Sequence, residues 1–424
     1  MSDGDGRGST FIVSLPLSTA ATNRRRPPAQ SGVTANVRSR VESVDLLRGA
    51  VMILMALDHV RDYFGGTSVS PTNLATTTVP LFFTRWITHV CAPVFFLLTG
   101  TGAYLAARHR SRRDLSRFLL TRGVWLLFLD AVALRCLGWQ FNFDYHVTIL
   151  NVLWALGWSM IALYALVHWP DRAVGAVGLI MIAAHNLLDP IRPSAFGSLA
   201  PIWSILHVQG VIVNRPGHVV LAAYPLIPWI GVTAVGYALG PVLDWNAERR
   251  RRLLWRMGAG AVTAFVVLRA MNVYGDPSRW TSQRSTVYTI LSFMNTTKYP
   301  PSLLFLLMTL GPALIMLWAF DRRPPAALRP VLTIGKVPMF YFVAHILAIH
   351  LLAVAVCWAR YGSVHWMFES PDLGHFPITE PPGWPLGLPA VYLIWGCVVV
   401  ALYPLCRWYA DVKARSHAAW LSYL

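Results

Sequence analysis

Residues 44–65 read VDLLRGAVMILMALDHVRDYFG, an apolar stretch with charged side chains at both ends. At about 1.5 Å per residue, the stretch is long enough to cross the ~30 Å hydrocarbon core of a bilayer as a helix. Asp45 and Arg48 lie three residues apart, so they share one face at the first end of this helix. Asp58 and His59 lie about 20 Å further along. The stretch therefore predicts a membrane-spanning helix with a polar cluster at each end.

The composition of the whole chain extends this prediction. Hydrophobic residues make up 55% of the 424 residues and charged residues only 13%, whereas a soluble protein carries about 25% charged residues. Short polar breaks separate apolar stretches at residues 45–64, 80–107, 118–138, 148–168, 173–188, 219–241, 253–272, 301–320, 331–358 and 386–406. The sequence predicts an all-α membrane protein, a polytopic bundle of about ten transmembrane helices in one domain over residues 41–410.

Short basic clusters, which contribute to a formal net charge of +17, alternate between the apolar stretches. They do not form one basic face with interleaved aromatic residues, so the sequence does not favour nucleic-acid binding. With this number of spans every cluster falls on the same side of the membrane, as the positive-inside rule requires. The sequence therefore predicts a multi-pass protein of the inner (plasma) membrane with both termini in the cytoplasm. Residues 1–40 would form a disordered arm and residues 411–424 a cytoplasmic tail.

The sequence predicts neither a disulfide framework nor a metal site. The cysteines form no CxxC pair, and most lie in apolar stretches, where a thiol behaves as a small hydrophobic group. Several residues of one loop carry potential ligand atoms, and these are His365, Glu369, Asp372 and His375. Their spacing is irregular and Pro371 interrupts it, so a solvated loop is the better interpretation.

Ionisable residues inside a membrane span are candidates for function, because each is costly to bury unless it is paired with another charge or hydrated. Asp58 and His59 place a carboxylate beside an imidazole, which can supply a general base and a group that orients it. Adjacent residues point about 100° apart on a helix, however. Asp58 therefore has the alternative of pairing with Arg61 or Asp62 on its own face.

Two pairs of polar residues lie at the ends of predicted spans. Asp45 and Arg48 form either an interfacial ion pair or a contact with a ligand. Asn295 and Lys298 begin the eighth span, where the lysine either reaches the membrane interface or holds a carboxylate, a phosphate or a developing oxyanion.

Two histidines of other spans complete the candidates. His89 enters the membrane from the outer side, where it either meets the level of Asp58 and His59 or is hydrogen-bonded to a neighbouring carbonyl. His345 lies in the middle of the ninth span with only His350 in reach along its own strip. It is therefore a candidate for lining a pore.

Several motifs are shared with one known family. The first span carries Asp45-Leu46-Leu47-Arg48-Gly49 followed by Asp58-His59. Further stretches are RWITHVCAPVFFLLTG at 85–100, LWALGWSM at 153–160, YPLIPWIGVTAVGYALG at 224–240, NTTKYPPSLLFLLMTLGP at 295–312 and GKVPMFYFVAH at 335–345. Over nearly the whole membrane portion the chain resembles the heparan-α-glucosaminide N-acetyltransferase family and its bacterial relatives. The resemblance implies a bundle without a tightly bound cofactor, which takes acetyl-CoA from the cytosolic side and acetylates an amino sugar on the far side.

A second, more distant resemblance is to surface-polysaccharide O-acyltransferases. Those enzymes carry an Arg-Gly pair in the first helix and a histidine ten residues after the glycine, a spacing that Gly49 and His59 share. They also carry paired arginines at the cytoplasmic start of a later helix, which Arg117 and Arg122 resemble. Guanidinium groups bind phosphate in bidentate fashion, so such a pair suits CoA. Each arginine taken singly is equally well explained by topology.

The chain departs from the animal enzymes of the first family at the histidine that the resemblance makes catalytic. That histidine lies in the loop after the first helix, whereas residues 65–79 contain no histidine. The catalytic role would therefore pass to His59, or to His89, which stands where the animal enzymes carry an acidic residue.

These observations predict a transmembrane acyltransferase that moves an acyl group, acetyl first of all, from cytosolic acyl-CoA to a hydroxyl or amine of an envelope or extracytoplasmic sugar. His59 would deprotonate the acceptor with help from Asp58. Lys298 or Asn295 would stabilise the oxyanion. Direct transfer and an acetyl-histidine intermediate on His59 or His89 both stay open.

Two other classes of protein remain as alternatives, a proton-coupled transporter or permease and a non-catalytic membrane scaffold. Binding of acetyl-CoA separates the acyltransferase from both. The expected partners are the lipid bilayer, acyl-CoA and a sugar or glycan acceptor, without nucleic acid, and a homo-oligomer is left open.

Overall fold

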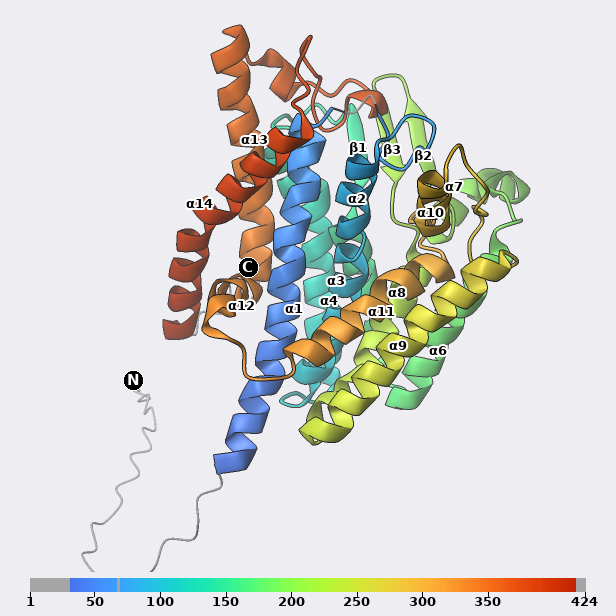
Figure 1. Cartoon of the computed structure of the whole chain (residues 1–424), viewed down its shortest axis with the longest axis vertical. Helices are drawn as coiled ribbons and strands as arrows, with labels where there is room; N and C mark the ends of the chain where they lie inside the picture. Colours follow the sequence, from blue (N-terminus) through green and yellow to red (C-terminus); the bar gives the residue numbers. More distant parts are fainter. Residues whose placement is uncertain (1–30, 67–68, 417–424) are drawn as a thin grey trace, which may run out of the picture.

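The structure, a computed structural model, describes residues 31–66 and 69–416 and is built mainly from helices (Figure 1). The helices of these residues are α1 (Ser31–Phe64), α2 (Val79–Thr88), α3 (Cys91–Ala107), α4 (Arg112–Phe128), α5 (Val152–Leu166), α6 (Asp171–Ala184), α7 (Ala200–Leu206), α8 (Leu226–Leu239), α9 (Ala247–Met271), α10 (Thr286–Met294), α11 (Leu303–Phe320), α12 (Arg329–Lys336), α13 (Pro338–Tyr361) and α14 (Leu388–Arg415). Of the predicted arm, residues 1–30 lie outside the described residues. The predicted tail is described as far as residue 416.

The chain is a membrane protein by the length and hydropathy of its helices. Within the described residues, 7 helical segments are long and apolar enough to cross a bilayer: Val79–Ala107, Asp171–Leu188, Leu226–Asp244, Ala247–Met271, Leu303–Phe320, Pro338–Tyr361 and Leu388–Arg415. α5 is also apolar but is shorter, with 15 residues. α1 and α4 occupy two further predicted stretches. A helix therefore lies in every predicted stretch, and 7 segments meet the requirements for a span.

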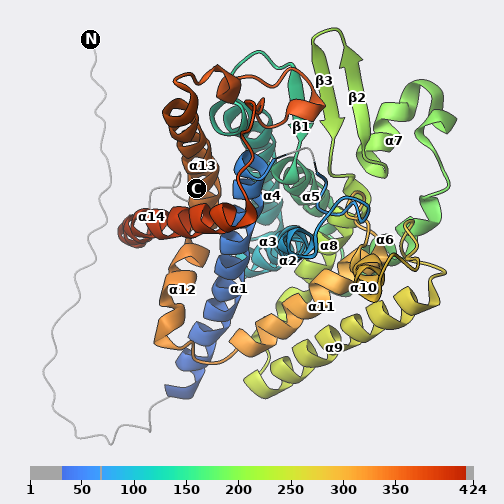
Figure 2. The ribbon, with the colours of Figure 1, turned by 45° about the horizontal axis from the view of Figure 1, so that its top comes forward.

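α1 runs through the middle of the bundle and contacts helices from both halves of the chain (Figure 2). Helices α12, α13 and α14 pack on one side of α1, and α2, α3 and α11 pack on the other. Further from α1, α3 packs on α8, α8 on α6, α4 on α5 and α9 on α11. The polar residues of α1 are therefore surrounded by other helices instead of lipid.

Glycines allow a close crossing between α1 and α12. Gly49 faces the backbone carbonyl of Val331, and Gly335 faces the carbonyl of Asp45. A Cβ at either glycine would overlap the facing carbonyl oxygen. Nη1 of Arg48 also donates to the carbonyl of Gly335 at 3.1 Å. Small residues let helices approach in this way in membranes, where packing and polar contacts, instead of hydrophobic burial, drive association.

We expect Gly335→Ala to destabilise the protein by about 1–3 kcal/mol, because the added methyl group would force α12 away from α1. Thermal unfolding in detergent measures the change. Gly260→Ala in α9 is the matched control, since a Cβ there meets no atom within 4 Å. Alanine is favoured over glycine in a helix by about 0.5–1 kcal/mol, so the control should be neutral or stabilising. Equal melting temperatures for the two variants would contradict the close crossing.

The prediction of an all-α fold needs one correction, because one end of the molecule carries a small sheet. Strands β1 (Val147–Leu150), β2 (Gly210–Arg215) and β3 (His218–Ala222) lie in the order β1-β3-β2. β1 pairs in parallel with β3, with Val147 opposite Val219, and β2 pairs with β3 antiparallel. Two predicted spans thus begin with strand residues. These segments are rich in β-branched residues, which fit a pleated strand better than a helix.

Several predicted spans are interrupted. α2 and α3 are separated at His89 and Val90. After α4 the chain continues as a wider π-type helix, Leu129–Trp139, a rare form that is often found at functional sites. α12 and α13 are separated at Val337, because Pro338 has no backbone N–H to continue the helix.

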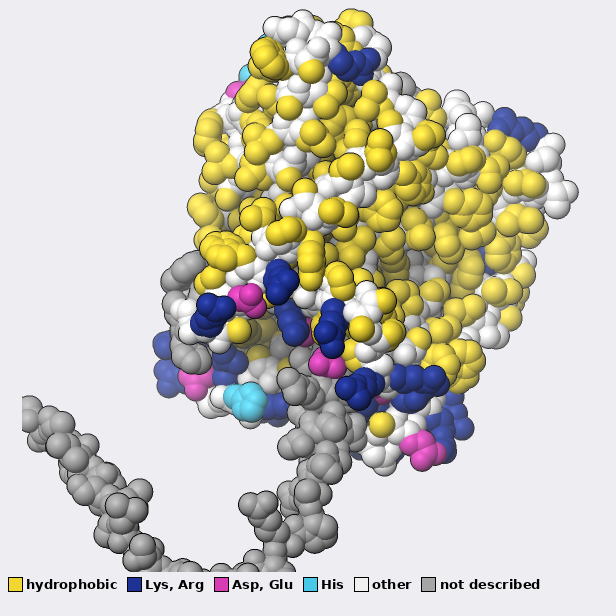
Figure 3. Space-filling model, turned by 60° about the vertical axis from the view of Figure 1, so that its left-hand side comes forward, with side chains coloured by type: hydrophobic (Ala, Val, Ile, Leu, Met, Phe, Trp, Pro, Cys, Tyr) yellow, Lys and Arg dark blue, Asp and Glu magenta, His cyan; other side chains and the backbone are white. Residues whose placement is uncertain are grey.

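Lys and Arg side chains gather at one end of the molecule, below a broad apolar belt (Figure 3). We call this the basic end. α3 and α11 end there and α9 begins there, next to Arg108, Arg249 and Arg322. The sheet lies at the opposite end (Figure 1). By the positive-inside rule the basic end is the predicted cytoplasmic end.

Candidate functional site

A polar chamber of about 240 Å³ lies beside α1. Its wall is formed by α1, α2, α3, the sheet and the loop before α11. Its main polar lining residues are Asp58, His59, Arg61, Asp62, Arg85, Asn151, Gln209, Tyr224, Lys298 and Tyr299. The chamber therefore combines ionisable groups from segments that are far apart in the sequence.

Asp58 belongs to a buried cluster of charges. Nη1 of Arg61 lies 2.9 Å from its carboxylate on the same helix, and Arg85 of α2 forms a second ion pair with it. Nη2 of Arg61 also pairs with Asp62 at 2.7 Å. The sequence leaves two arrangements open for Asp58, a catalytic one beside His59 and a pairing along its own helix, and the structure shows the pairing with Arg61. A carboxylate bound to two guanidinium groups is a poor base, so the geometry gives Asp58 the role of holding Arg85 in the chamber.

Arg85 is a site residue that the sequence interpretation missed. It lies inside the predicted span 80–107, and the rule that an ionisable residue in a span is a functional candidate applies to it as well as to Asp58. That signal could have identified Arg85. Its partner could not be inferred, because the ion pair forms only when α2 packs on α1.

His59 is held on the chamber wall by ring contacts. Its imidazole stacks on Trp139 with 4.8 Å between ring centroids and meets the edge of His345 at 5.0 Å. Nδ1 of His345 lies 2.9 Å from the carbonyl of Tyr341, which can only accept a hydrogen bond, so Nε2 of His345 is left as an acceptor. Neither Nδ1 of His59 nor Nε2 of His345 has a hydrogen-bond partner among the described residues. His345 thus lies behind His59, and His59 faces the chamber as an imidazole of fixed orientation.

Cations outnumber carboxylates on the chamber wall. Arg61, Arg85 and Lys298 line it against Asp58 and Asp62. The excess positive charge can stabilise an anion that develops inside the chamber.

The same positive charge affects the pKa of Tyr299. Burial raises the pKa of its phenol, but the charges of Lys298 and Arg85, together with hydrogen bonds from Tyr224 and Lys298, bring this pKa below its usual value. The ring of Tyr299 lies 5.1 Å from Nζ of Lys298 and 5.2 Å from the ring of Tyr224. Positive charge that lowers the pKa of a phenol also favours the oxyanion of an acyl-transfer step.

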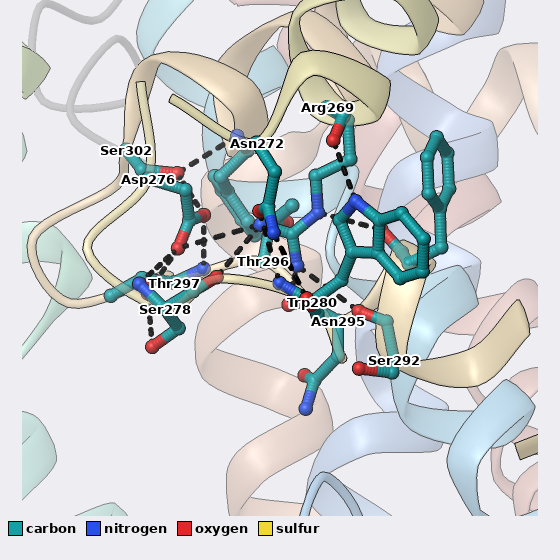
Figure 4. A network of polar contacts seen from close by, with 12 residues as sticks. Arg269, Asn272, Asp276, Ser278, Trp280, Ser292, Asn295, Thr296, Thr297 and Ser302 are labelled. Atoms are coloured by element: carbon teal, nitrogen blue, oxygen red, sulfur yellow. Dashed lines mark hydrogen bonds and ion pairs between the residues drawn. The ribbon is translucent and has the colours of Figure 1, made fainter. Parts of the chain in front are cut away.

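A buried polar network holds the loop that carries Lys298 (Figure 4). Arg269, at the end of α9, donates to the backbone carbonyls of Phe293, Ser292, Asn295 and Ser278 at 2.7–3.0 Å. Asp276 accepts from the N–H of Thr297 at 2.9 Å and from the hydroxyl of Ser302 at 2.7 Å. Lys298 lies between these two anchored residues. The backbone at Lys298 is therefore held in place before any ligand binds.

A second hollow of about 330 Å³, the outer hollow, adjoins the chamber and shares Arg85, Gln209, Lys298 and Tyr299 with it. His89 and Asn295 line the outer hollow, not the chamber. His89 is 3% exposed and packs against Phe305 with 5.4 Å between ring centroids. The side-chain amide of Asn295 donates to the carbonyl of Thr72 at 2.9 Å. The structure therefore separates both residues from the cavity that His59 lines.

An apolar cavity of about 320 Å³ adjoins the chamber from the other direction, and Phe95 and Val152 line both. Most of its wall is apolar, with Leu98, Leu126, Leu153, Leu156, Met160 and Phe342 among the lining residues. Its basic lining residues are Arg48, Arg122 and Lys413. An apolar cavity with basic side chains thus ends at the polar chamber.

Only some of the binding residues predicted in the first and third spans line this cavity. Arg48 and Arg122 line it, whereas Arg117 is exposed on α4. Nη1 of Arg48 also lies 2.6 Å from Oδ1 of Asp45, so the ion pair and contact with a ligand are compatible. Lys413 was missed as a site residue, because it follows the last span and its charge was explained by topology alone.

A family model described as heparan-α-glucosaminide N-acetyltransferase, catalytic, matches residues 40–274, which is more than half of the chain. No curated protein matches the chain significantly. The matched residues extend from α1 to α9 and include His59, Arg85 and Arg122, while Lys298 and Lys413 lie beyond them. The match confirms the family resemblance that the motifs predict.

Proposed function

The chain belongs to the heparan-α-glucosaminide N-acetyltransferase catalytic family, and we propose that it is an acyl-CoA-dependent acyltransferase of the inner membrane. The acyl group, with acetyl as the preferred one, would pass from cytosolic acyl-CoA to a hydroxyl or amine of an extracytoplasmic sugar.

The arrangement of the two cavities carries this proposal. The apolar cavity suits the thioester arm of acyl-CoA, and Arg48, Arg122 and Lys413 suit its phosphates. At its other end, Phe95 and Val152 line both the apolar cavity and the polar chamber. A thioester carbonyl at this point would face His59 and the chamber cations.

The acceptor would reach the chamber through the outer hollow, which shares Gln209 and Tyr299 with it. His59 would take the proton from the acceptor O–H or N–H as its oxygen or nitrogen attacks the thioester carbon. Lys298 and Arg85 would stabilise the tetrahedral oxyanion. Collapse of this intermediate breaks the C–S bond, and the CoA thiolate leaves and takes up the proton held by His59. This direct route needs no nucleophile from the enzyme.

Binding of labelled acetyl-CoA to the purified full-length protein in detergent is the first test. We expect saturable binding by the wild type. Arg122→Ala should weaken it about 10-fold or more, because a charge-assisted contact with phosphate contributes about 1.5–3 kcal/mol.

Arg117→Ala is the matched control, since Arg117 lies on the same helix but is exposed. It removes the same charge and should leave the affinity nearly unchanged. No saturable binding by the wild type would reject the acyltransferase and favour a transporter or scaffold. Equal weakening by both substitutions would reject the apolar cavity as the binding site.

A further inference from the structure

His185, Asp189 and His207 come together near the sheet end, outside the chamber. His185 begins a short turn after α6, Asp189 follows one turn later, and His207 directly follows α7. One ligand atom from each residue lies within 4.8 Å of the others. It is the one group of three potential metal ligands found this close together among the described residues.

The histidines of this cluster are buried and only partly hydrogen-bonded. His185 is 2% exposed and His207 is 1% exposed. Nε2 of His207 lies 3.1 Å from Oδ1 of Asp189. Among the described residues, however, Nδ1 of His207 and both nitrogens of His185 make no hydrogen bond of ordinary geometry, although the Pro301 carbonyl lies near the His185 ring. Buried imidazole nitrogens without partners are unusual unless a ligand satisfies them.

We propose that His185, Asp189 and His207 bind one divalent transition-metal ion, Zn²⁺ in the first instance. Two imidazoles and one carboxylate are a donor set that Zn²⁺ prefers, with water in the fourth position. Bonds of about 2.0–2.2 Å place tetrahedral ligand atoms about 3.3 Å apart. Small side-chain rotations from the present separations of up to 4.8 Å would achieve this.

Neighbouring groups already orient the carboxylate. Nδ2 of Asn186 donates to Oδ2 of Asp189 at 2.9 Å, which leaves Oδ1 toward His207. Oδ1 of Asn186 accepts from the N–H of Leu303, at the start of α11, at 2.9 Å. Hydrogen bonds of this kind to a ligating carboxylate orient it and are typical of metal sites.

Asp189 is the member of the cluster that lines a hollow at the surface. This hollow, of about 680 Å³, is also lined by Val208 and the residues 190–194. Arg192 is part of that lining and would repel a cation, but its side chain is exposed and its charge is screened by water.

The position of the cluster indicates what the ion would do. Gln209 follows His207 by two residues, lines both the chamber and the outer hollow, and immediately precedes β2. A metal bridge from His207 to His185 would tie this segment to the end of α6. The ion would therefore hold Gln209 and the sheet in place, and it would take no part in the chemistry of the chamber.

Metal binding by the tag-free, full-length protein in detergent tests the site without any measurement of activity. The protein is stripped with chelator, titrated with Co²⁺ and then competed with Zn²⁺. We expect one equivalent of Co²⁺ with the visible absorption of a four-coordinate N/O site, displaced by one equivalent of Zn²⁺. Zn²⁺ should also raise the melting temperature by several degrees, because it binds the folded state.

His185→Gln, His207→Gln and Asp189→Asn should each abolish the Co²⁺ spectrum. His365→Gln removes an exposed histidine and should leave it unchanged. No Co²⁺ spectrum in the wild type, or one that persists in His185→Gln, would overturn the site. The wild-type titration decides the question even if a variant does not fold, and neither result depends on whether acetyl-CoA binds.

Discussion

Replacement of His59 by alanine is expected to lower acyl transfer from acetyl-CoA by about 10²–10⁴-fold, the range that a general base contributes. The substitution removes the imidazole that faces the chamber beside Lys298 and Arg85. Binding of acetyl-CoA should persist, because the basic residues of the apolar cavity are left intact. Consumption of labelled acetyl-CoA with glucosamine or simple glycosides as acceptors measures the rate.

His89→Gln is the comparison for this prediction, because His89 lines the outer hollow and packs on Phe305. It should reduce the rate far less than His59→Ala. The reverse order would place the base at His89 and contradict the role of His59. A His59→Ala protein that transfers acetyl normally would contradict the proposed mechanism as a whole.

Asp58→Asn is expected to destabilise the folded protein by about 3–5 kcal/mol, because it leaves Arg85 buried without its counter-charge. Arg61 keeps a partner in Asp62, at 2.7 Å, so most of the cost should fall on Arg85. Thermal unfolding in detergent and the yield of monodisperse protein measure the loss.

A double substitution separates the ion pair from the other effects of the change. Asp58→Asn with Arg85→Met removes the uncompensated charge and replaces it with an unbranched apolar side chain. It should recover much of the stability that Asp58→Asn loses, since buried ion pairs can be exchanged for apolar groups at little cost. A double variant as unstable as the sum of the single variants would show that Asp58 and Arg85 do not interact.

The sequence could predict where the helices lie and which polar residues of α1 fall inside a membrane span. Apolar length is a local property, so every predicted stretch contains a helix, and 7 segments are long and apolar enough to span. The same rule that identified Asp58 and His59 applied to Arg85, which was overlooked. The sheet was missed because short β-branched runs beside apolar helices are indistinguishable from the ends of those helices.

The partners of these residues could not be predicted. Asp58 pairs with Arg85, which lies 27 positions later in the sequence. His59 contacts Trp139 and His345, which belong to two other segments. His185 and His207 were not singled out, because they are 22 positions apart, which is far from the short ligand spacings of typical zinc motifs. Only the tertiary structure brings their ligand atoms within 4.8 Å of one another.

By itself, the sequence determined that this chain is a helical membrane protein of an acetyltransferase family, because hydropathy, charge alternation and linear motifs are written along the chain. The tertiary structure alone decided that Arg122, but not Arg117, lines the apolar cavity, and that His59, but not His89, lines the chamber. Neighbouring helix residues differ in direction by about 100°, so the sequence shows that a polar side chain lies in or beside a span but not which way it faces. That direction is set by the helices that pack around it.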